Sequence, residues 1–418
     1  MSAAALLHAQ GPAAGDAGSG CGAVYTLSPE MLRRAHALYL WRTGLSVVFP
    51  VWSILALLAL LHFRWSARLG DWAASLTGRR WLQGLCFAPL LLLLLDLLSL
   101  PPALVAHHVS LAYGQSIQRW GSWFLDWSKA LAIDMVSGAA VLGALFALIR
   151  HCKRWWLWFW LLSIPVQVFV TFVLPLAIDP LFNRFDPLQQ TNPALVSKLE
   201  QVVKKTNVSI PPSRMFLMNA SRKLTGSNAY VTGFGSSLRI VIWDTSIKSS
   251  PQDEILMIFG HELGHYVLRH IEHGLEIAAV VSFFFLWAGF FLAQAMLRRF
   301  GPGWRIRAMD DWTAAPLLLL VATVLSLAAQ PLANAVSRRQ EHEADVFGQE
   351  AVHGIVQDPE CVAARSFQRL GKESLEYPDP NPLVVFWSYS HPPISSRMNF
   401  AAHYDPWRPG GHPRYFTK

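Results

Sequence analysis

Two histidines lie four residues apart in the segment His261-Glu262-Leu263-Gly264-His265. Residues at this spacing share one face of an α-helix, so both imidazoles can reach a single metal ion. Imidazole is a favoured ligand of zinc, and the Glu262 carboxylate beside the first histidine can take a proton from an attacking water. The pattern predicts a hydrolytic metal site. The alternative, two solvated histidines on a polar helix, is disfavoured because residues 255–260 are mostly apolar.

A catalytic zinc site needs a third protein ligand and an open position. His270 and His273 do not have the spacing of the extended H-E-x-x-H-x-x-G-x-x-H motif. If they continue the same helix, predicted for residues 251–270 with Ser250 as its N-cap, they lie too far along it to reach the metal. We therefore expect them to be interfacial or solvated residues.

A second polar segment, residues 338–345, contains a better candidate for the third ligand. Glu341 and Asp345 are one helical turn apart, so Glu341 can bind the metal while Asp345 accepts the second N–H of a ligand histidine. Glu343 lies about 200° from Glu341 around that helix and is not expected to face the metal. Taken alone, the segment would be interpreted as a solvated helix face. It becomes a candidate ligand segment only because the first motif needs a third ligand.

The apolar composition of the chain indicates which kind of elements hold these residues. Hydrophobic residues make up 53% of the 418 residues and charged residues only 15%, whereas soluble domains have about a quarter charged. Six apolar segments bordered by basic residues are long enough to cross a bilayer. They comprise residues 43–63, 81–106, 130–149, 155–178, 277–297 and 312–337. The net charge of +8 is then better explained by lipid headgroups and membrane topology than by nucleic acid.

The predicted fold class is a mostly α, polytopic α-helical membrane protein with six spans and a small α+β zinc-metalloprotease domain. The β-prone runs 214–219, 228–232 and 238–243, the last two joined by a Gly-Ser turn, predict a strand and a hairpin. The domains expected are an N-terminal tail and lead-in, four spans, a zinc region with an edge strand, two further spans and a C-terminal catalytic part, at 1–36, 37–179, 180–275, 276–337 and 338–418.

The N-terminal residues 1–22 are rich in Ala and Gly and lack the features of a signal peptide, so they are interpreted as a disordered tail. The four cysteines are Cys21, Cys86, Cys152 and Cys361. Their scattered positions indicate neither a disulfide framework nor a thiolate metal site.

With these motifs the sequence resembles the integral-membrane zinc metalloproteases of the M48 type, in particular the Ste24/CAAX prenyl protease 1 group. The resemblance covers about residues 90–400. It rests on segments in matching order, namely Leu100-Pro101, Tyr113-Gly114-Gln115-Ser116, residues 178–185, Ser227-Asn228-Ala229-Tyr230, residues 239–245, the His261–His265 motif, Glu341 with Asp345, and Tyr389-Ser390-His391-Pro392-Pro393. Family members usually have seven spans; the six counted here lack the first, and the insertion some members carry before the zinc helix is absent.

The resemblance implies one zinc ion per chain, bound by His261, His265 and Glu341. It also implies that Glu262 is the general base and that Asp345 supports a ligand histidine. The implied architecture is a ring of membrane helices around a large chamber that is capped by the zinc domain.

The resemblance also nominates residues near the substrate. His391 would lie beside it, and Asn228 belongs to a strand whose edge would pair with an extended peptide, as in β-augmentation. Arg397, about a turn beyond His391, is a candidate partner of Glu341 or of a substrate carboxylate; otherwise it is an ordinary surface arginine.

The function expected is a zinc metalloendopeptidase that acts on a peptide or protein substrate, with cleavage near a prenylated C-terminal cysteine as one option. The alternatives are a membrane-protein quality-control protease without a prenyl requirement and, from another class, a membrane scaffold or channel with a degenerate site. We expect a monomer in a bacterial-type cell membrane rather than the ER membrane, with no nucleic-acid partner. Near the span ends, eleven Lys and Arg residues lie on the face opposite the zinc domain and eight on its own face, which favours an outward-facing zinc domain.

Overall fold

Long helices make up most of the chain in the computed structural model, which describes residues 21–233 and 235–416. Within these described residues, six helices are long and apolar enough to cross a membrane, which confirms the predicted number of spans. They are α1 (Pro29–His62), α3 (Arg80–Ala112), α4 (Trp120–His151), α5 (Trp155–Phe172), α11 (His270–Trp304) and α12 (Ala315–Val352).

Several of these helices continue beyond the predicted spans. Helix α1 begins at Pro29 after Ser28, whose hydroxyl accepts a hydrogen bond from the Met31 N–H. Helix α12 runs on for fifteen residues past the predicted end at 337 and so carries the polar segment 338–345 out of the apolar region. By contrast, the predicted fourth span is divided, because α5 ends at Phe172 and α6 (Leu174–Phe182) follows.

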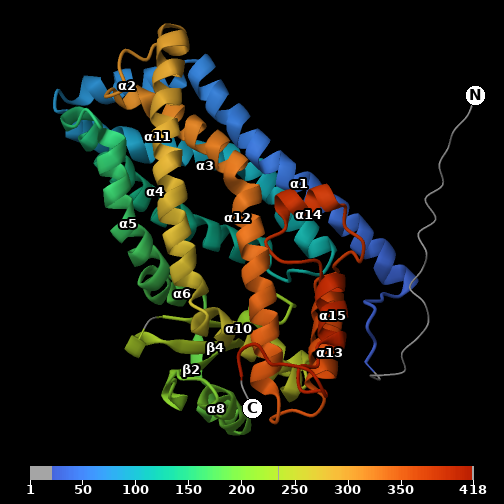
Figure 1. Cartoon of the computed structure of the whole chain (residues 1–418). Coiled ribbons are helices and arrows are strands. Elements are labelled where there is room, and N and C mark those ends of the chain that lie inside the picture. Colours follow the sequence, from blue (N-terminus) through green and yellow to red (C-terminus); the bar gives the residue numbers. More distant parts are fainter. Residues whose placement is uncertain (1–20, 234, 417–418) are drawn as a thin grey trace, which may run out of the picture.

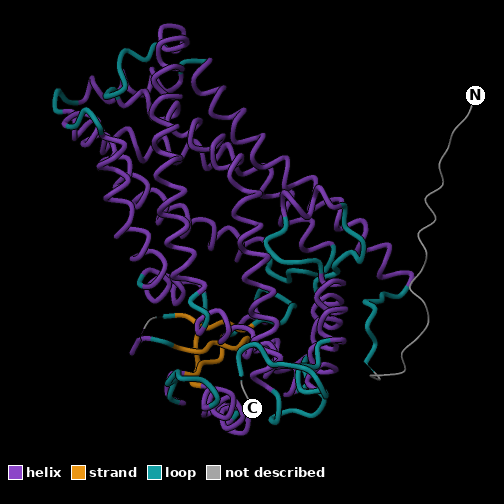
Figure 2. The backbone as a smooth tube through the Cα atoms, in the orientation of Figure 1, coloured by secondary structure: helices purple, strands orange, loops and turns teal. Residues whose placement is uncertain are grey.

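The membrane helices form an open bundle, with α2 (Trp65–Leu76) at one end and all strands at the other (Figures 1 and 2). Between α5, α11 and α12 lies a mostly apolar cavity of about 1040 Å³. Its lining includes Phe159, Phe285 and Leu327, together with the polar side chains of Ser326 and Gln330.

Four short strands form one sheet at the end of the bundle. They are β1 (Phe185–Pro187), β2 (Met215–Met218), β3 (Ala229–Thr232) and β4 (Arg239–Trp243), in the order β1-β2-β4-β3. Strands β3 and β4 pair antiparallel, with Tyr230 opposite Val241, which confirms the predicted hairpin. Because β2 occupies the other side of β4, β3 stands at the edge of this sheet.

Short helices surround the sheet and share its core. They are α7 (Leu188–Thr191), α8 (Pro193–Lys204), α9 (Asp244–Ser249), α10 (Gln252–Val267), α13 (Pro359–Glu373) and α15 (Ile394–His403). Helix α14 (Pro382–Ser388) packs instead against α12 and α1. Leu199 of α8, Ile240 of β4, Phe259 of α10, Phe347 of α12 and Val362 of α13 are all buried in one apolar cluster. The sheet, α10 and the extension of α12 therefore belong to one packed unit.

Helix α10 is shorter than the predicted helix 251–270. It starts at Gln252, with Pro251 rather than Ser250 in the N-cap position. It ends at Val267, and Arg269 then takes a left-handed backbone conformation with φ of 57° before α11 begins. The prediction that His270 continues the same helix is wrong, since this break turns the chain.

A disulfide joins Cys21 to Cys361, two residues that are 340 positions apart in sequence. The interpretation of the cysteines as carrying no disulfide is therefore wrong for this pair, because no local spacing announces a pairing between two distant segments. Cys21 lies at the start of the described chain and Cys361 in the first turn of α13. Cys86 and Cys152 are free. The predicted tail falls largely on residues 1–20, which are outside the described residues.

The disulfide bears on which side of the membrane carries the sheet. Disulfides persist in oxidising compartments and are rare in the cytosol, and the distribution of basic residues also favours placing the opposite face inside. We expect the sheet-bearing end to face away from the cytosol. In intact cells, a membrane-impermeant maleimide should label Cys361 after treatment with an impermeant reductant. Cys152, at the far end of α4, should react only after the membrane is opened.

The control for this experiment is the double variant Cys21→Ser/Cys361→Ser, which removes both thiols of the disulfide while leaving Cys152 available. Labelling of Cys152 in intact cells, with Cys361 protected, would reverse the assignment of the two faces.

Candidate active site

Helices α10 and α12 approach each other closely at two glycines. A Cβ atom added to Gly348 would lie 2.7 Å from the backbone nitrogen of His261, and one added to Gly260 would lie 3.0 Å from the carbonyl oxygen of Gly348. This contact lets the polar extension of α12 lie directly against the first histidine of α10. Alanine has the higher helix propensity, but the contact leaves no room for its Cβ atom, so glycine is favoured at both positions.

Gly348→Ala should therefore separate α10 from α12 and weaken the site between them. Overpacking of a tight contact typically costs about 1–3 kcal/mol of stability. We expect a lower melting temperature and a loss of bound metal, measured by thermal unfolding and metal analysis. Gly143→Ala in α4 is the matched control, because its added Cβ meets no atom within 4 Å. Equal stability and metal content in the two variants would contradict this account.

Three side chains from these helices converge on one point. His261 Nε2 lies 3.1 Å from His265 Nε2 and 3.3 Å from Glu341 Oε2, while His265 Nε2 lies 3.5 Å from Glu341 Oε1. Ligand atoms at about 2.0–2.1 Å from one tetrahedral ion are separated by about 3.3 Å. The three side chains thus have the spacing of ligands around a single small metal ion.

The environment of Glu341 supports the same interpretation. Its side chain is buried, and Oε2 makes no hydrogen bond within the part of the chain that the structure describes. A buried carboxylate oxygen without a hydrogen-bond donor is costly unless a cation completes its surroundings. The residues present therefore fit a metal ion.

Asp345 lies behind His261, on the side away from Glu341. Its Oδ1 is 2.8 Å from His261 Nδ1, and both of its oxygens accept hydrogen bonds from Arg397, from Nε at 2.9 Å and from the terminal nitrogen at 2.6 Å. The Arg397 side chain is only 11% exposed, so it is not an ordinary surface arginine, and its terminal nitrogen also lies 3.7 Å from Glu341. Burial alone would lower the pKa of Arg397, but the carboxylate of Asp345 raises it.

The pKa values of Glu262 and His265, both on α10, are shifted in opposite directions. Burial raises the pKa of the Glu262 carboxyl to about 7, so this group can both accept and return a proton near neutral pH. Burial and the charge of His261 lower the pKa of His265 to about 3. The His265 imidazole is therefore neutral and offers a lone pair to a metal.

His391 and Asn228 lie around the same small pocket as Glu262 and His261. His391 Nε2 is 3.2 Å from Glu341 Oε1, and its side chain is 58% exposed, which leaves it accessible to a bound molecule. Asn228 immediately precedes β3, and its backbone N–H donates to the Ser246 hydroxyl. The edge strand thus starts beside the candidate metal ligands.

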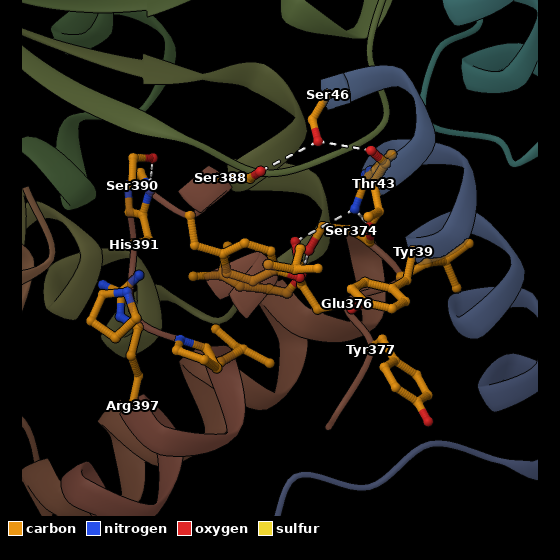
Figure 3. Close-up of a pocket in the computed structure, with 18 residues that line it drawn as sticks. Tyr39, Thr43, Ser46, Ser374, Glu376, Tyr377, Ser388, Ser390, His391 and Arg397 are labelled. Carbon is orange, nitrogen blue, oxygen red and sulfur yellow. Dashed lines mark hydrogen bonds and ion pairs between the residues drawn. The ribbon is translucent and has the colours of Figure 1, made fainter. Parts of the chain in front are cut away.

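A larger cavity of about 440 Å³ adjoins this pocket and shares His391 and Arg397 with it (Figure 3). It lies between α1, the end of α13 and the segment 388–394. Arg42 of α1 lines it and forms an ion pair with Glu376 at 3.5 Å. Motif spacing gives no signal for Arg42 or Glu376, because they come from segments over 300 residues apart.

Comparison with known proteins identifies the family. Residues 189–405 match "Peptidase family M48", and residues 24–184 match "CAAX prenyl protease N-terminal, five membrane helices". The chain belongs to peptidase family M48. It is accordingly a multi-pass membrane metalloprotease, and its family implies a metal cofactor and a peptide or protein substrate.

The relatives of this M48 peptidase include bacterial and eukaryotic proteins. It is 37% identical to the uncharacterized metalloprotease YhfN of Bacillus subtilis, over 80% of this chain and 77% of that protein. It is 26% identical to CAAX prenyl protease 1 of Saccharomyces cerevisiae, over 76% and 71% of the two chains. The crystal structure of S. mikatae Ste24p has the same fold, with a TM-score of 0.73 and 22% identity over 89% of this chain and 88% of that one.

Proposed function

We propose that this M48 peptidase is a zinc endopeptidase that uses His261, His265 and Glu341 as metal ligands and Glu262 as its general base. The observation that carries the proposal is the convergence of three ligand atoms, 3.1–3.5 Å apart, beside a carboxyl group whose pKa is near 7. Zinc is favoured over other metals because two imidazoles and one carboxylate are the ligand set of known catalytic zinc sites. When bound, zinc supplies a Lewis acid that polarises the scissile carbonyl and acidifies water.

The chain's own groups then divide the proton transfers. Glu262 in its ionised form takes a proton from the attacking water and later gives it to the leaving amine. Ser390 is 2.9 Å from His391 Nδ1 and can donate to it, which places the proton of the neutral imidazole on Nε2. His391 can then donate from Nε2 to the oxyanion that develops on the carbonyl. Arg397 is engaged by Asp345, so its role is to hold Asp345 against His261.

The substrate is proposed to bind as an extended peptide along the edge of β3, with Asn228 at one end of that edge. Main-chain hydrogen bonds to an edge strand give affinity with little dependence on sequence. The cavity that contains Arg42 and Glu376 would receive the peptide segment that passes His391 (Figure 3).

The metal site is tied directly to the membrane, which bears on the substrate class. The ligands of α10 precede the membrane helix α11 by only a short connection, and Glu341 lies on the continuation of α12. The apolar cavity between α5, α11 and α12 reaches Gly274 and Gln340, close to the ligand segments. A lipid or strongly apolar element of a substrate could partition there, at about 0.8 kcal/mol per buried CH₂.

We therefore propose a membrane-associated substrate that carries a lipid modification or a strongly apolar segment, and take a prenylated C-terminal cysteine as the test case. The experiment compares kcat/KM for a farnesylated peptide and its unmodified twin with the full-length protein in liposomes. We expect the ratio to exceed ten. A ratio near one, with good activity on both peptides, would favour a quality-control protease without a prenyl requirement.

We further propose that the protein is a monomer in a bacterial cell membrane. The labelling of Cys361 and Cys152 determines which side of that membrane, and so which proteins, the site can reach.

A further inference from the structure

His270 lies in an unexpected place behind the second candidate metal ligand. The break between α10 and α11 turns its side chain back, so that His270 Nδ1 lies 3.1 Å from His265 Nδ1. On the other side of its ring, Nε2 lies 3.4 Å from Glu343 Oε2. The side chain of His270 is only 4% exposed, so neither ring nitrogen relies on bulk water.

His265, His270 and Glu343 thus form a row of contacting side chains. The hydrogen positions in this row follow from the chemistry of imidazole. The Nε2 atom of His265 is the one that faces His261 and Glu341, so in the metal-bound state it carries no proton. A neutral His265 then bears its proton on Nδ1 and donates it to Nδ1 of His270. His270, neutral in turn, bears its proton on Nε2, which is the atom that faces the Glu343 carboxylate.

Helix α12 holds both ends of this row. Gln340 donates a hydrogen bond from Nε2 to the backbone carbonyl of His270 at 3.2 Å. Glu343 itself accepts from Arg339 at 3.1 Å and lies 3.6 Å from Arg414 of the C-terminal segment. The Glu343 carboxylate is therefore fixed in position and charge by two arginines.

We propose that His270 is a positioning residue that, together with Glu343, orients His265 toward the metal. The proposal rests on the proposed role of His265 as a ligand. Asp345 contacts His261 in a corresponding way. Helix α12 would therefore supply the ligand Glu341 and also orient the imidazole rings of both ligand histidines. Groups that hold ligand histidines in this way typically contribute about 10–100-fold to metal affinity or activity.

The experiment measures zinc affinity of the full-length protein in detergent by competition with a chelator, and the visible spectrum of its Co²⁺ form. His270→Leu removes the acceptor for the His265 Nδ1–H, and we expect it to weaken zinc binding by about 10–100-fold and to change the Co²⁺ spectrum. His270→Asn places an amide oxygen near the position of Nδ1 and should restore affinity to within a few-fold of the wild type. Glu343→Gln should fall between the two.

His273→Leu is the matched control, since His273 is exposed on the next turn of α11 and should bind zinc as the wild type does. The proposal is overturned if His270→Leu keeps wild-type affinity, or if His270→Asn is as weak as His270→Leu, which would assign the effect to packing alone. Because affinity is measured without a peptide, these results are distinct from failure of the proposed function. That failure would show as a wild-type protein that binds zinc but cleaves no peptide, or that binds no zinc at all.

Discussion

Replacing Glu262 by glutamine is expected to lower kcat/KM by at least about 10²–10⁴-fold while leaving zinc bound. Glutamine keeps the shape of the side chain but cannot accept a proton from water at neutral pH. The pKa of Glu262, raised by burial to about 7, suits a group that must be ionised before the attack and protonated after it. Zinc should remain because the three converging ligand atoms belong to other residues.

The measurement pairs kcat/KM on one peptide with the zinc content of the same preparation. Glu30→Gln, an exposed carboxylate in the first turn of α1, controls for the loss of one negative charge. If Glu262→Gln retained activity within tenfold of the wild type, another group would have to be the base.

Glu341→Ala should abolish both zinc binding and hydrolysis. The substitution removes one of the three ligand atoms and leaves two histidines, which cannot complete a catalytic site with a single open position. It also takes away the acceptor near His391 and Arg397, so that the surrounding positive groups lose their partner. Metal analysis after dialysis should find no zinc under conditions that saturate the wild type.

Glu343→Gln provides the graded comparison, because Glu343 lies on the same helix and touches His270 rather than the ligand atoms. It should keep zinc at saturating concentration and show only weakened affinity. Complete loss of zinc in Glu343→Gln with retention in Glu341→Ala would mean that the third ligand has been assigned to the wrong carboxylate.

The sequence alone determined those features whose information is local. Spacing of four residues places His261 and His265 on one helical face, and runs of about twenty apolar residues define the six membrane helices. The hairpin of β3 and β4 is likewise visible, because its strands are adjacent and joined by a Gly-Ser turn. Spacing of one helical turn also made Glu341 and Asp345 candidates, and the resemblance to a family linked them to the first motif, some 80 residues away.

Only the tertiary structure decided how distant segments meet. The contact at Gly260 and Gly348 sets the distance between α10 and α12, and no spacing within either helix encodes it. The disulfide of Cys21 with Cys361 and the ion pair of Arg42 with Glu376 join parts of the chain more than 300 residues apart. His270, expected from the sequence to be interfacial or solvated, is buried instead, and for a different reason. Its position depends on a single left-handed residue, Arg269, and a periodic pattern of apolar residues cannot reveal a break at one residue.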